Sequence, residues 1–357
     1  MKLKSWFVKS TEWEHWPSFM YYAPLLPYFL YKTWKARSLT YFSAANPGIK
    51  MAGNGTESKY TTLMLLPEHY RPLSIYVQAG TSANLVLEQI SQSDISYPLI
   101  LKPDIGFRGY MVKKIDNEKL LKAYINNFAH PLIVQEFVGY PNEMGVFYHR
   151  LPNQKKGKIT SLTLKKYPTL TGDGQSTLKQ LIENDSRAYL YFDLLKNIHH
   201  QKLDHIYAQD EVIPLSFIGN HSKGTQFING NHLIDEALTS VFDSLSHQTN
   251  GWYYGRMDLK YNSFEELKEG KNFKVLEING IISEPTHIYD PKHPEAGYFK
   301  CIDTIKEHWE IIDKIAYINR TQSSVTVPGV KEYLKNLYWL RNYSRKLIRA
   351  NNLNLDL

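Results

Sequence analysis

The chain has 357 residues, a hydrophobic content of 43%, a net charge of +7 and a single cysteine, Cys301. This length accommodates one large domain or two to three lobes with a sizeable core. One cysteine excludes an internal disulfide framework and suits a reducing compartment, so we interpret Cys301 as structural. Positive charge gathers at the two ends: residues 1–50 hold seven Lys or Arg against two Glu, and residues 331–357 hold six against two acidic residues. The body between them is slightly acidic, which argues against a nucleic-acid enzyme.

An apolar aromatic segment lies near the N-terminus. Residues 17–31 carry no charge, but Pro24 and Pro27 interrupt this run, and it is shorter than the ~20 residues that a bilayer-spanning helix needs. Two interpretations stay open: a helix buried against the protein's own core, or an interfacial anchor with Trp and Tyr at headgroup level. Residues 330–349 repeat this chemistry as a basic amphipathic helix. We therefore expect a cytoplasmic protein with peripheral attachment to the anionic inner face of the cell membrane.

Hydrophobic periodicity predicts a mixed α+β body. Residues 38–47 resemble a strand, and the glycine-rich residues 47–59 mark a boundary near residue 55. The predicted strands then cover 72–78, 97–103, 109–115, 131–138, 143–150, 157–167, 252–261 and 272–279. The predicted helices cover 82–93, 117–128, 176–185 and 233–249, with Ser176 as the expected N-cap of the third, and residues from about 302 onward are also expected to be helical.

The last two predicted strands carry acidic side chains that alternation places on one face. In the second strand Glu277 and Asn279 point away from Leu276 and Ile278, which we expect on the buried face. The segment that joins the two strands is long enough for them to pair antiparallel. This pairing would bring Asp258 of the first strand opposite Glu277 and Asn279. Two carboxylates and an amide, without His or Cys, make a hard-oxygen site suited to magnesium rather than zinc. For this pattern alone, a solvated edge strand is the alternative.

Other charged residues suit contact with phosphate groups. Arg256 shares the strand face of Asp258, where it could stabilise charge on a transferred phosphoryl group or an oxyanion. Lys102 ends a strand before a loop that contains Gly106 and Gly109, a way to set backbone amides and an ammonium against phosphates. This loop is neither a Walker A motif nor a dinucleotide-binding turn, and taken alone it is more typical of a plain hairpin.

Taken in order, these motifs resemble the ATP-grasp superfamily over about residues 57–291. The motifs are Lys59 in ESKY, Lys102 in LKP, QEFV followed by Glu143, then GRMDLK and EING. The segment YPTLTGDGQSTLKQLI is similar to the ATP-grasp part of cyanophycin synthetase, and the GRMD and EIN pair is similar to D-alanine:D-alanine ligase. The resemblance implies a fold like the ATP-binding domain of glutathione synthetase, with two α+β lobes holding the nucleotide between them.

The resemblance also implies a role for each matching residue. The implied nucleotide-binding residues are Lys59, Lys102, Gly106, Gly109, Gln135, Glu136, Val138 and Glu143, the last of them for the ribose. The implied metal ligands are Asp258, Glu277 and Asn279, which would hold two Mg²⁺ ions, or Mn²⁺ in their place. The implied catalytic residues are Arg256, Lys102 and Lys166, with Lys165 as the alternative to Lys166.

These roles predict an ATP-dependent carboxylate:amine ligase that forms an amide through an acylphosphate intermediate. Its partners would be ATP, a carboxylate, an amine and an anionic membrane surface, without nucleic acid. The alternatives are a soluble amino-acid or peptide ligase, and a nucleotide-binding scaffold without catalysis. The predicted domains are an apolar aromatic segment with a shortened region before the ATP-grasp domain (residues 1–56), a catalytic domain (57–300) and a basic helical tail (301–357).

The substrates are not determined by the resemblance. The 58 residues before Lys59 are fewer than family members carry there, and the sequence after EIN departs from that of the dipeptide ligases. We therefore expect substrate contacts from the loop that follows EIN. The candidates in this loop are Glu284, His287, Tyr289 and Asp290.

Overall fold

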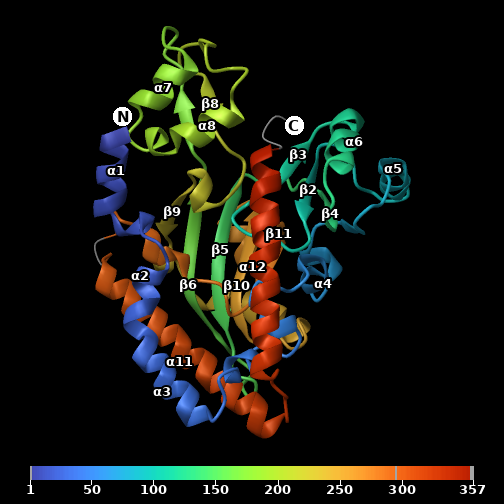
Figure 1. Ribbon diagram of the computed structural model, residues 1–357, viewed down its shortest axis with the longest axis vertical. Helices are drawn as coiled ribbons and strands as arrows, with labels where there is room; N and C mark the ends of the chain where they lie inside the picture. The colour runs from blue at the N-terminus through green and yellow to red at the C-terminus, as the bar shows by residue number, and fades with distance from the viewer. Residues whose placement is uncertain (1, 294–295, 354–357) are drawn as a thin grey trace.

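The computed structural model describes residues 2–293 and 296–353, so the last residues of the predicted basic tail lie outside the described part. Two antiparallel sheets form the body of the protein, and a small lobe, an N-terminal helical arm and two long C-terminal helices pack around them (Figure 1). This arrangement confirms the predicted α+β class.

The first sheet has the strand order β1-β4-β2-β3, and every neighbouring pair is antiparallel. Its strands are β1 (Ser74–Val77), β2 (Leu99–Pro103), β3 (Lys113–Ile115) and β4 (Leu132–Glu136). The helices α5 (Ala83–Ser91) and α6 (Glu118–Asn126) contribute apolar side chains to the core of this sheet. The predicted strand at 109–115 is shorter than expected, because Gly109 and Met111 adopt positive φ angles and make a turn before β3.

The second sheet is larger and has the order β11-β10-β5-β6-β9, again with antiparallel neighbours. Its strands are β5 (Asn142–His149), β6 (Lys158–Lys166), β9 (Gln226–Asn229), β10 (Tyr254–Tyr261) and β11 (Phe273–Asn279). Two helices, α9 (Glu236–Gln248) and α10 (Phe264–Lys268), join its largest apolar core. The chain passes from the first sheet to the second between β4 and β5, so the residues of that crossing border both lobes.

A small lobe is inserted in the chain between the paired strands β6 and β9, and we call residues 168–224 the insert lobe. It contains the strand pair β7 (Thr169–Thr171) and β8 (Val212–Pro214) with the helices α7 (Leu178–Asn184) and α8 (Phe192–Ile198) around its own apolar cluster. The expected N-cap of α7 is wrong by one residue. Thr177 caps the helix in a capping box with Gln180, whereas the Ser176 hydroxyl donates to Asp173 at 2.6 Å.

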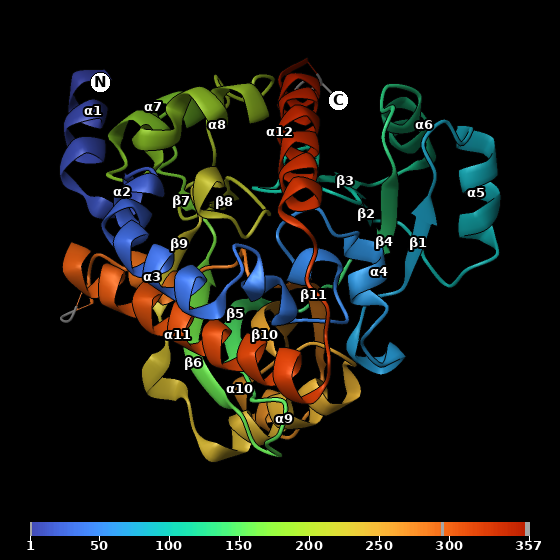
Figure 2. The same cartoon turned by 60° about the horizontal axis from the view of Figure 1, so that its bottom comes forward.

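The N-terminal arm, residues 2–45, comprises α1 (Lys2–Thr11), α2 (Phe19–Tyr22) and α3 (Leu26–Ala36). In both views α2 and α3 lie along α11 (Tyr298–Gln322), whereas α1 extends beyond it toward the insert lobe (Figures 1 and 2). Tyr21 and Leu25 are buried in one cluster with Cys301 of α11, as expected for a structural cysteine. The strand expected at 38–47 is wrong. These residues instead contain a 3₁₀ helix, Tyr41–Ala44, because the small residues there pack flat against α11 and accept a hydrogen bond from Asn319 at 2.8 Å.

The basic C-terminal segment forms α12 (Val330–Leu353), which runs across the front of the molecule between the sheets (Figure 1). Its Tyr343 and Leu347 are buried in the core of the first sheet. A short helix, α4 (Lys59–Leu63), begins at the expected phosphate-binding lysine. Within the described residues no helix combines the length and the apolar character that a membrane crossing requires.

Candidate active site

A cavity of about 1160 Å³ lies between the two sheets and also reaches the insert lobe, the N-terminal arm and α12. Nearly all residues that the sequence assigned to nucleotide, metal or catalysis line it, although they come from separate parts of the chain. A second cavity of about 980 Å³ lies between the end of α3 and residues 327–330, but no carboxylate lines it. The large cavity is therefore the candidate active site.

The acidic residues come together through the pairing of β10 with β11. Asp258 is the direct cross-strand partner of Glu277, and Arg256 is the partner of Asn279. The Asn279 amide donates to the Asp258 carboxylate at 3.2 Å, which leaves the amide oxygen of Asn279 available for other contacts. The antiparallel return of the chain predicted from the sequence is thus present in the structure.

One expectation about this strand is wrong. The register shifts by one residue between Asp258 and Leu259, so that Leu276 is the extra residue of a β-bulge. As a result Leu276 and Glu277 both line the cavity, while Val275 and Ile278 are buried in the core on the other side. Strict alternation would have put Leu276 beside Ile278. The bulge instead adds an apolar side chain to the cavity wall next to the carboxylates.

Two lysines from other elements face the acidic residues. Lys59, at the start of α4, makes an ion pair with Glu277. Lys102, at the end of β2, donates to the side-chain oxygen of Gln135 at 3.0 Å and to the backbone oxygen of Leu276 at 3.1 Å. Burial lowers the pKa of Lys102 to about 8, although the nearby Glu277 carboxylate opposes this shift. An anionic ligand in the cavity would restore full charge to this ammonium.

Lys165, rather than Lys166, reaches the site. The Lys165 ammonium lies 2.8 Å from Glu143 and 2.9 Å from Asp258, whereas Lys166 is exposed and does not line the cavity. The two neighbours point to opposite faces of the second sheet, and only Lys165 shares the face that carries Glu143 and Asp258 and lines the cavity. We therefore correct the expected catalytic residue Lys166 to its alternative, Lys165.

Arg256 completes a cationic clamp on Asp258. Its guanidinium lies 3.1 Å from the Asp258 carboxylate and donates to the backbone oxygen of Glu284 at 3.2 Å. Burial alone would raise the pKa of Asp258, but Arg256 and Lys165 outweigh it and hold that pKa well below its usual value. Asp258 is therefore a carboxylate at neutral pH.

The residues expected around the nucleotide line the same cavity near the crossing between the sheets. Gln135 is buried and donates to the Ser74 hydroxyl at 3.0 Å, while Glu136 and Val138 line the cavity at the crossing between the sheets. Glu143 is already engaged by Lys165 and by the hydroxyl of Tyr167, so a ribose would share it with these partners.

Gly106 and Gly109 belong to a loop that closes one side of the cavity. Gly109 has a φ of +67° and no room for a side chain, since a Cβ there would lie 2.7 Å from Ile218 of the insert lobe. Gly219 of the insert lobe is equally confined, since a Cβ there would lie 2.0 Å from the Glu143 carboxylate. Residues 217–224 therefore pack directly over the cavity.

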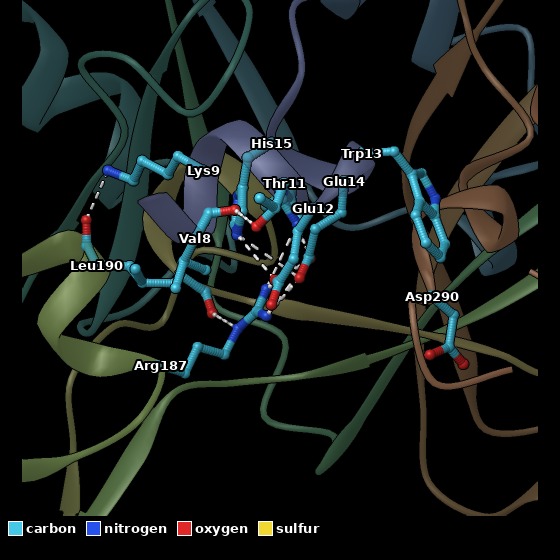
Figure 3. A network of polar contacts seen from close by, with 12 residues as sticks. Val8, Lys9, Thr11, Glu12, Trp13, Glu14, His15, Arg187, Leu190 and Asp290 are labelled. Carbon is cyan, nitrogen blue, oxygen red and sulfur yellow. Dashed lines mark hydrogen bonds and ion pairs between the residues drawn. The ribbon is translucent and has the colours of Figure 1, made fainter. Parts of the chain in front are cut away.

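The N-terminal arm closes the remaining side through contacts that sequence reasoning missed. The Glu14 side chain is 98% buried, accepts from Arg187 of the insert lobe at 3.3 Å and lies 2.7 Å from His221. Figure 3 shows Arg187 reaching this carboxylate and Lys9 reaching the backbone oxygen of Leu190, at 2.8 Å. The sequence signal for this contact was Glu14 next to the uncharged run of residues 17–31, because a carboxylate that is buried with such a run needs a charged or hydrogen-bonding partner.

Glu14, His15 and His221 place three potential ligand atoms within 4.8 Å of one another. The Arg187 guanidinium already supplies the positive charge that this cluster needs, since it contacts both oxygens of Glu14 and lies 3.4 Å from the His221 ring nitrogen. We therefore interpret the cluster as an ionic contact between the arm and the insert lobe.

The four substrate-contact candidates after EIN separate into two pairs. Glu284 and Tyr289 line the cavity. His287 instead contacts the Ser161 hydroxyl at 2.7 Å, with burial lowering its pKa to about 4, and Asp290 accepts from the backbone amide of Asn229 at 2.9 Å. The latter two therefore anchor the loop to the second sheet.

Comparison with solved structures returns ligases and synthetases of low identity. The chain is similar to a bifunctional glutathione synthetase from Pasteurella multocida, with 14% identity over 71% of this chain and 38% of that one and a TM-score of 0.37. It is also similar to the VanG D-Ala:D-Ser ligase from Enterococcus faecalis, with 12% identity over 71% and 61% of the two chains and a TM-score of 0.40. A third similar structure is the ATP-grasp ligase PsnB, with 12% identity over 70% and 60% and a TM-score of 0.37.

The chain spans less than two thirds of the length of these three proteins. The sequence matches no family model, and no curated protein is significantly similar to it. The structures found include an ATP-grasp ligase, the class that the sequence motifs resemble. With identities and TM-scores this low, the functional argument depends on the geometry of the cavity itself.

Proposed function

We propose that this protein is an ATP-dependent carboxylate:amine ligase. The observation that carries the proposal is that one cavity brings together Asp258, Glu277 and Asn279, on two paired strands, with Lys59 of α4 and Lys102 of the first sheet. Three oxygen-bearing side chains facing two ammonium groups across a cleft suit a triphosphate and its divalent cation.

The donor set fits magnesium. Asp258 and Glu277 supply carboxylate oxygens and Asn279 an amide oxygen, and hard cations such as Mg²⁺ prefer oxygen ligands with phosphate oxygens completing the shell. Bound there with ATP, the metal would neutralise charge on the phosphates. A pair of ions, or Mn²⁺ in place of Mg²⁺, is compatible with the same set. We expect Lys59 to exchange its ion pair with Glu277 for a phosphate oxygen when the metal binds.

The first chemical step would be transfer of the γ-phosphoryl group to a substrate carboxylate. A carboxylate oxygen attacks the γ-phosphorus in line, the bond from that phosphorus to the β–γ bridging oxygen breaks, and ADP leaves. Lys59 and Lys102 would offset the charge on the phosphoryl oxygens. Closure of the cavity by residues 217–224 and the N-terminal arm would protect the resulting acylphosphate from water.

The second step would be displacement of phosphate by an amine. The nitrogen of the neutral amine attacks the carbonyl carbon, the carbon–oxygen bond to phosphate breaks, and the departing phosphate takes the proton that the nitrogen loses as the amide forms. Arg256 would stabilise the tetrahedral oxyanion, since its guanidinium already lies on the substrate side of Asp258 beside the Glu284 backbone. Lys165 would fix Asp258 and Glu143 in place throughout the reaction.

We assign the nucleotide to the end of the cavity at the crossing between the sheets. Gln135, Glu136 and Val138 would contact the adenine, and Glu143 the ribose. Gly106 and Gly109 would let the loop approach the phosphates. We keep the predicted division into residues 1–56, a catalytic unit of residues 57–300, and residues 301–357, with the N-terminal arm and α12 packing on the catalytic unit.

We also propose that the enzyme works at the cytoplasmic face of an anionic membrane. The arm buries one side against α11, but it exposes large aromatic side chains on the other. Phe19 is 64% and Trp34 is 76% exposed, and the basic Lys35 and Arg37 follow directly. Aromatic rings beside basic residues suit the headgroup region of an anionic bilayer. Co-sedimentation with phosphatidylserine vesicles, lost in Trp34→Ser, would support this part, and equal sedimentation of both proteins would exclude it.

The ligase proposal is tested by ADP release from purified protein with Mg²⁺ and ATP against amino acids, dipeptides and lipid extracts. We expect stimulation by one carboxylate and one amine together, abolished in Asp258→Asn and Glu277→Gln. ADP release that is equal in all samples and in both variants would refute the proposal. Full activity without detergent or lipid would favour the alternative of a soluble amino-acid or peptide ligase.

A further inference from the structure

A second acidic site lies in the same cavity, beyond the proposed metal ligands. Glu284 follows β11 in the loop that lines the cavity, and it is half-buried. One of its carboxylate oxygens accepts from the Tyr22 hydroxyl at 2.7 Å, and the other accepts from the Tyr289 hydroxyl at 2.8 Å. Two fixed donors hold the carboxylate in one orientation, and one of them comes from the N-terminal arm.

Glu284 makes no ion pair among the described residues, although the charge of the nearby Arg256 guanidinium acts on it. The cavity carboxylates that do make ion pairs are Glu14, Glu143, Asp258 and Glu277. Of the other two cavity carboxylates, Glu57 accepts from a backbone amide and lies close to the charge of Lys59, and Glu136 lies at the proposed nucleotide end.

Both partners of Glu284 are neutral donors. Burial, helped by the negative charge of Glu284, raises the pKa of Tyr22 and of Tyr289 well above the ordinary value, so both keep their protons. The negative charge of the carboxylate is therefore held in place by neutral donors and is only partly offset by the Arg256 guanidinium. A half-buried carboxylate is stable when a cation completes its shell, and the cavity is open to a ligand at this position.

The position of Glu284 close to the proposed reaction centre indicates which kind of cation it would bind. Arg256 connects the two regions, because its guanidinium binds Asp258 and also donates to the Glu284 backbone oxygen. A group bound at Glu284 would thus lie next to the proposed oxyanion. The proposed reaction needs an amine there, and a primary amine at neutral pH is an ammonium ion with three donors.

We infer that Glu284, held by Tyr22 and Tyr289, binds the ammonium group of the amine acceptor and accepts one of its protons before the nitrogen attacks, and that the N-terminal arm helps to build this acceptor site. This inference depends on the proposed ligase function. The arm residues Trp16, Pro17 and Ser18 also line the cavity, so the acceptor would lie between the arm and the second sheet. The carboxylate donor is anionic, and Glu284 would repel it from this position.

The test compares a charged and an uncharged nucleophile. Hydroxylamine, which is uncharged at pH 8, intercepts an acylphosphate without needing a cation site. Each protein is assayed for ADP release with the best carboxylate from the screen, plus either hydroxylamine or one of glycine, D-alanine and ethanolamine. In Glu284→Gln we expect the KM for the cationic amine to rise about 20-fold, because a charge-assisted contact is lost, while the hydroxylamine rate stays within about twofold.

Two further variants keep the result interpretable. Tyr22→Phe retains the carboxylate but removes one donor, and we expect a rise in the amine KM of about three- to tenfold. Glu265→Gln, at an exposed position outside the cavity, should change neither rate. Circular dichroism and the thermal unfolding midpoint show whether each variant folds.

The outcomes separate the two proposals. An unchanged amine KM in Glu284→Gln and Tyr22→Phe would overturn the inference alone, as would equal loss of the hydroxylamine and amine rates in the folded variants. A wild-type protein that uses hydroxylamine but none of the cationic amines would also overturn it. Wild-type protein that releases no ADP with any carboxylate and hydroxylamine would overturn the ligase proposal, and the inference with it.

Discussion

The neighbours Lys165 and Lys166 give a matched pair of variants that tests the geometry of the site. Lys165→Met removes an ammonium that lies 2.8 Å from Glu143 and 2.9 Å from Asp258, and its side chain is only 7% exposed. Burial favours the neutral amine, but Asp258 and Glu143 raise the pKa of Lys165 above its ordinary value, so it is charged. Lys166→Met removes an exposed ammonium one residue away.

The expected magnitude follows from these contacts. At an effective dielectric constant of about 20, each ion pair contributes roughly 6 kcal/mol of Coulomb energy before the desolvation of the ammonium is subtracted. Removing one partner of such a buried pair typically costs about 3 to 5 kcal/mol. We expect the lower end for Lys165→Met, because Arg256 still pairs with Asp258 and Tyr167 still donates to Glu143. Lys166→Met should stay within about 0.5 kcal/mol of the wild type.

Urea unfolding followed by circular dichroism measures the stability difference, and ADP release with the best substrate pair measures activity. In the fraction of Lys165→Met that is folded, we expect activity to fall about 100-fold or more, since a preorganised charge near the phosphoryl group is lost. Lys166→Met should retain activity within about twofold. Equal effects of the two variants on stability and activity, or a larger effect of Lys166→Met, would refute the placement of Lys165 between the two carboxylates.

Three further predictions concern the frame of the site. Gly280→Ala should lower the free energy of unfolding by about 2 kcal/mol or more, because a Cβ would lie 2.1 Å from the backbone oxygen of Ala52, whereas Gly139→Ala has nothing within 4 Å; equal urea midpoints would contradict this. Burial lowers the pKa of His308 to about 3, so as the pH falls below about 6.5 only the unfolded chain takes up a proton at this residue, and stability is lost from there down to about pH 3. In His308→Gln the slope of unfolding free energy against pH between 5.5 and 4.5 should therefore be smaller by about 1 kcal/mol per pH unit, and an unchanged slope would refute the assignment. Glu14→Gln should speed limited proteolysis of residues 168–224 severalfold, as it removes the charge that Arg187 and His221 contact; unchanged cleavage would show that the arm does not hold the insert lobe.

The sequence determined the local features of this protein. Alternation along β10 placed Asp258 correctly, and the length of the following segment predicted its antiparallel return to Glu277. Alternation failed in β11, where one extra residue shifts the pairing register and so changes the side of the sheet on which Leu276 lies. Neither the bulge at Leu276 nor the orientation of Lys165 relative to Lys166 can be inferred from alternation alone, because both depend on which neighbour each strand pairs with.

The tertiary structure decided what surrounds these groups. Sequence reasoning left the N-terminal arm open between a core helix and a surface anchor, and the structure shows that it buries Tyr21 while exposing Trp34. The contacts of Glu14 with Arg187 and of Tyr22 with Glu284 join residues more than 170 positions apart. No periodicity records such contacts, because they arise only when separately folded elements pack and each buried charge or hydroxyl must find a partner.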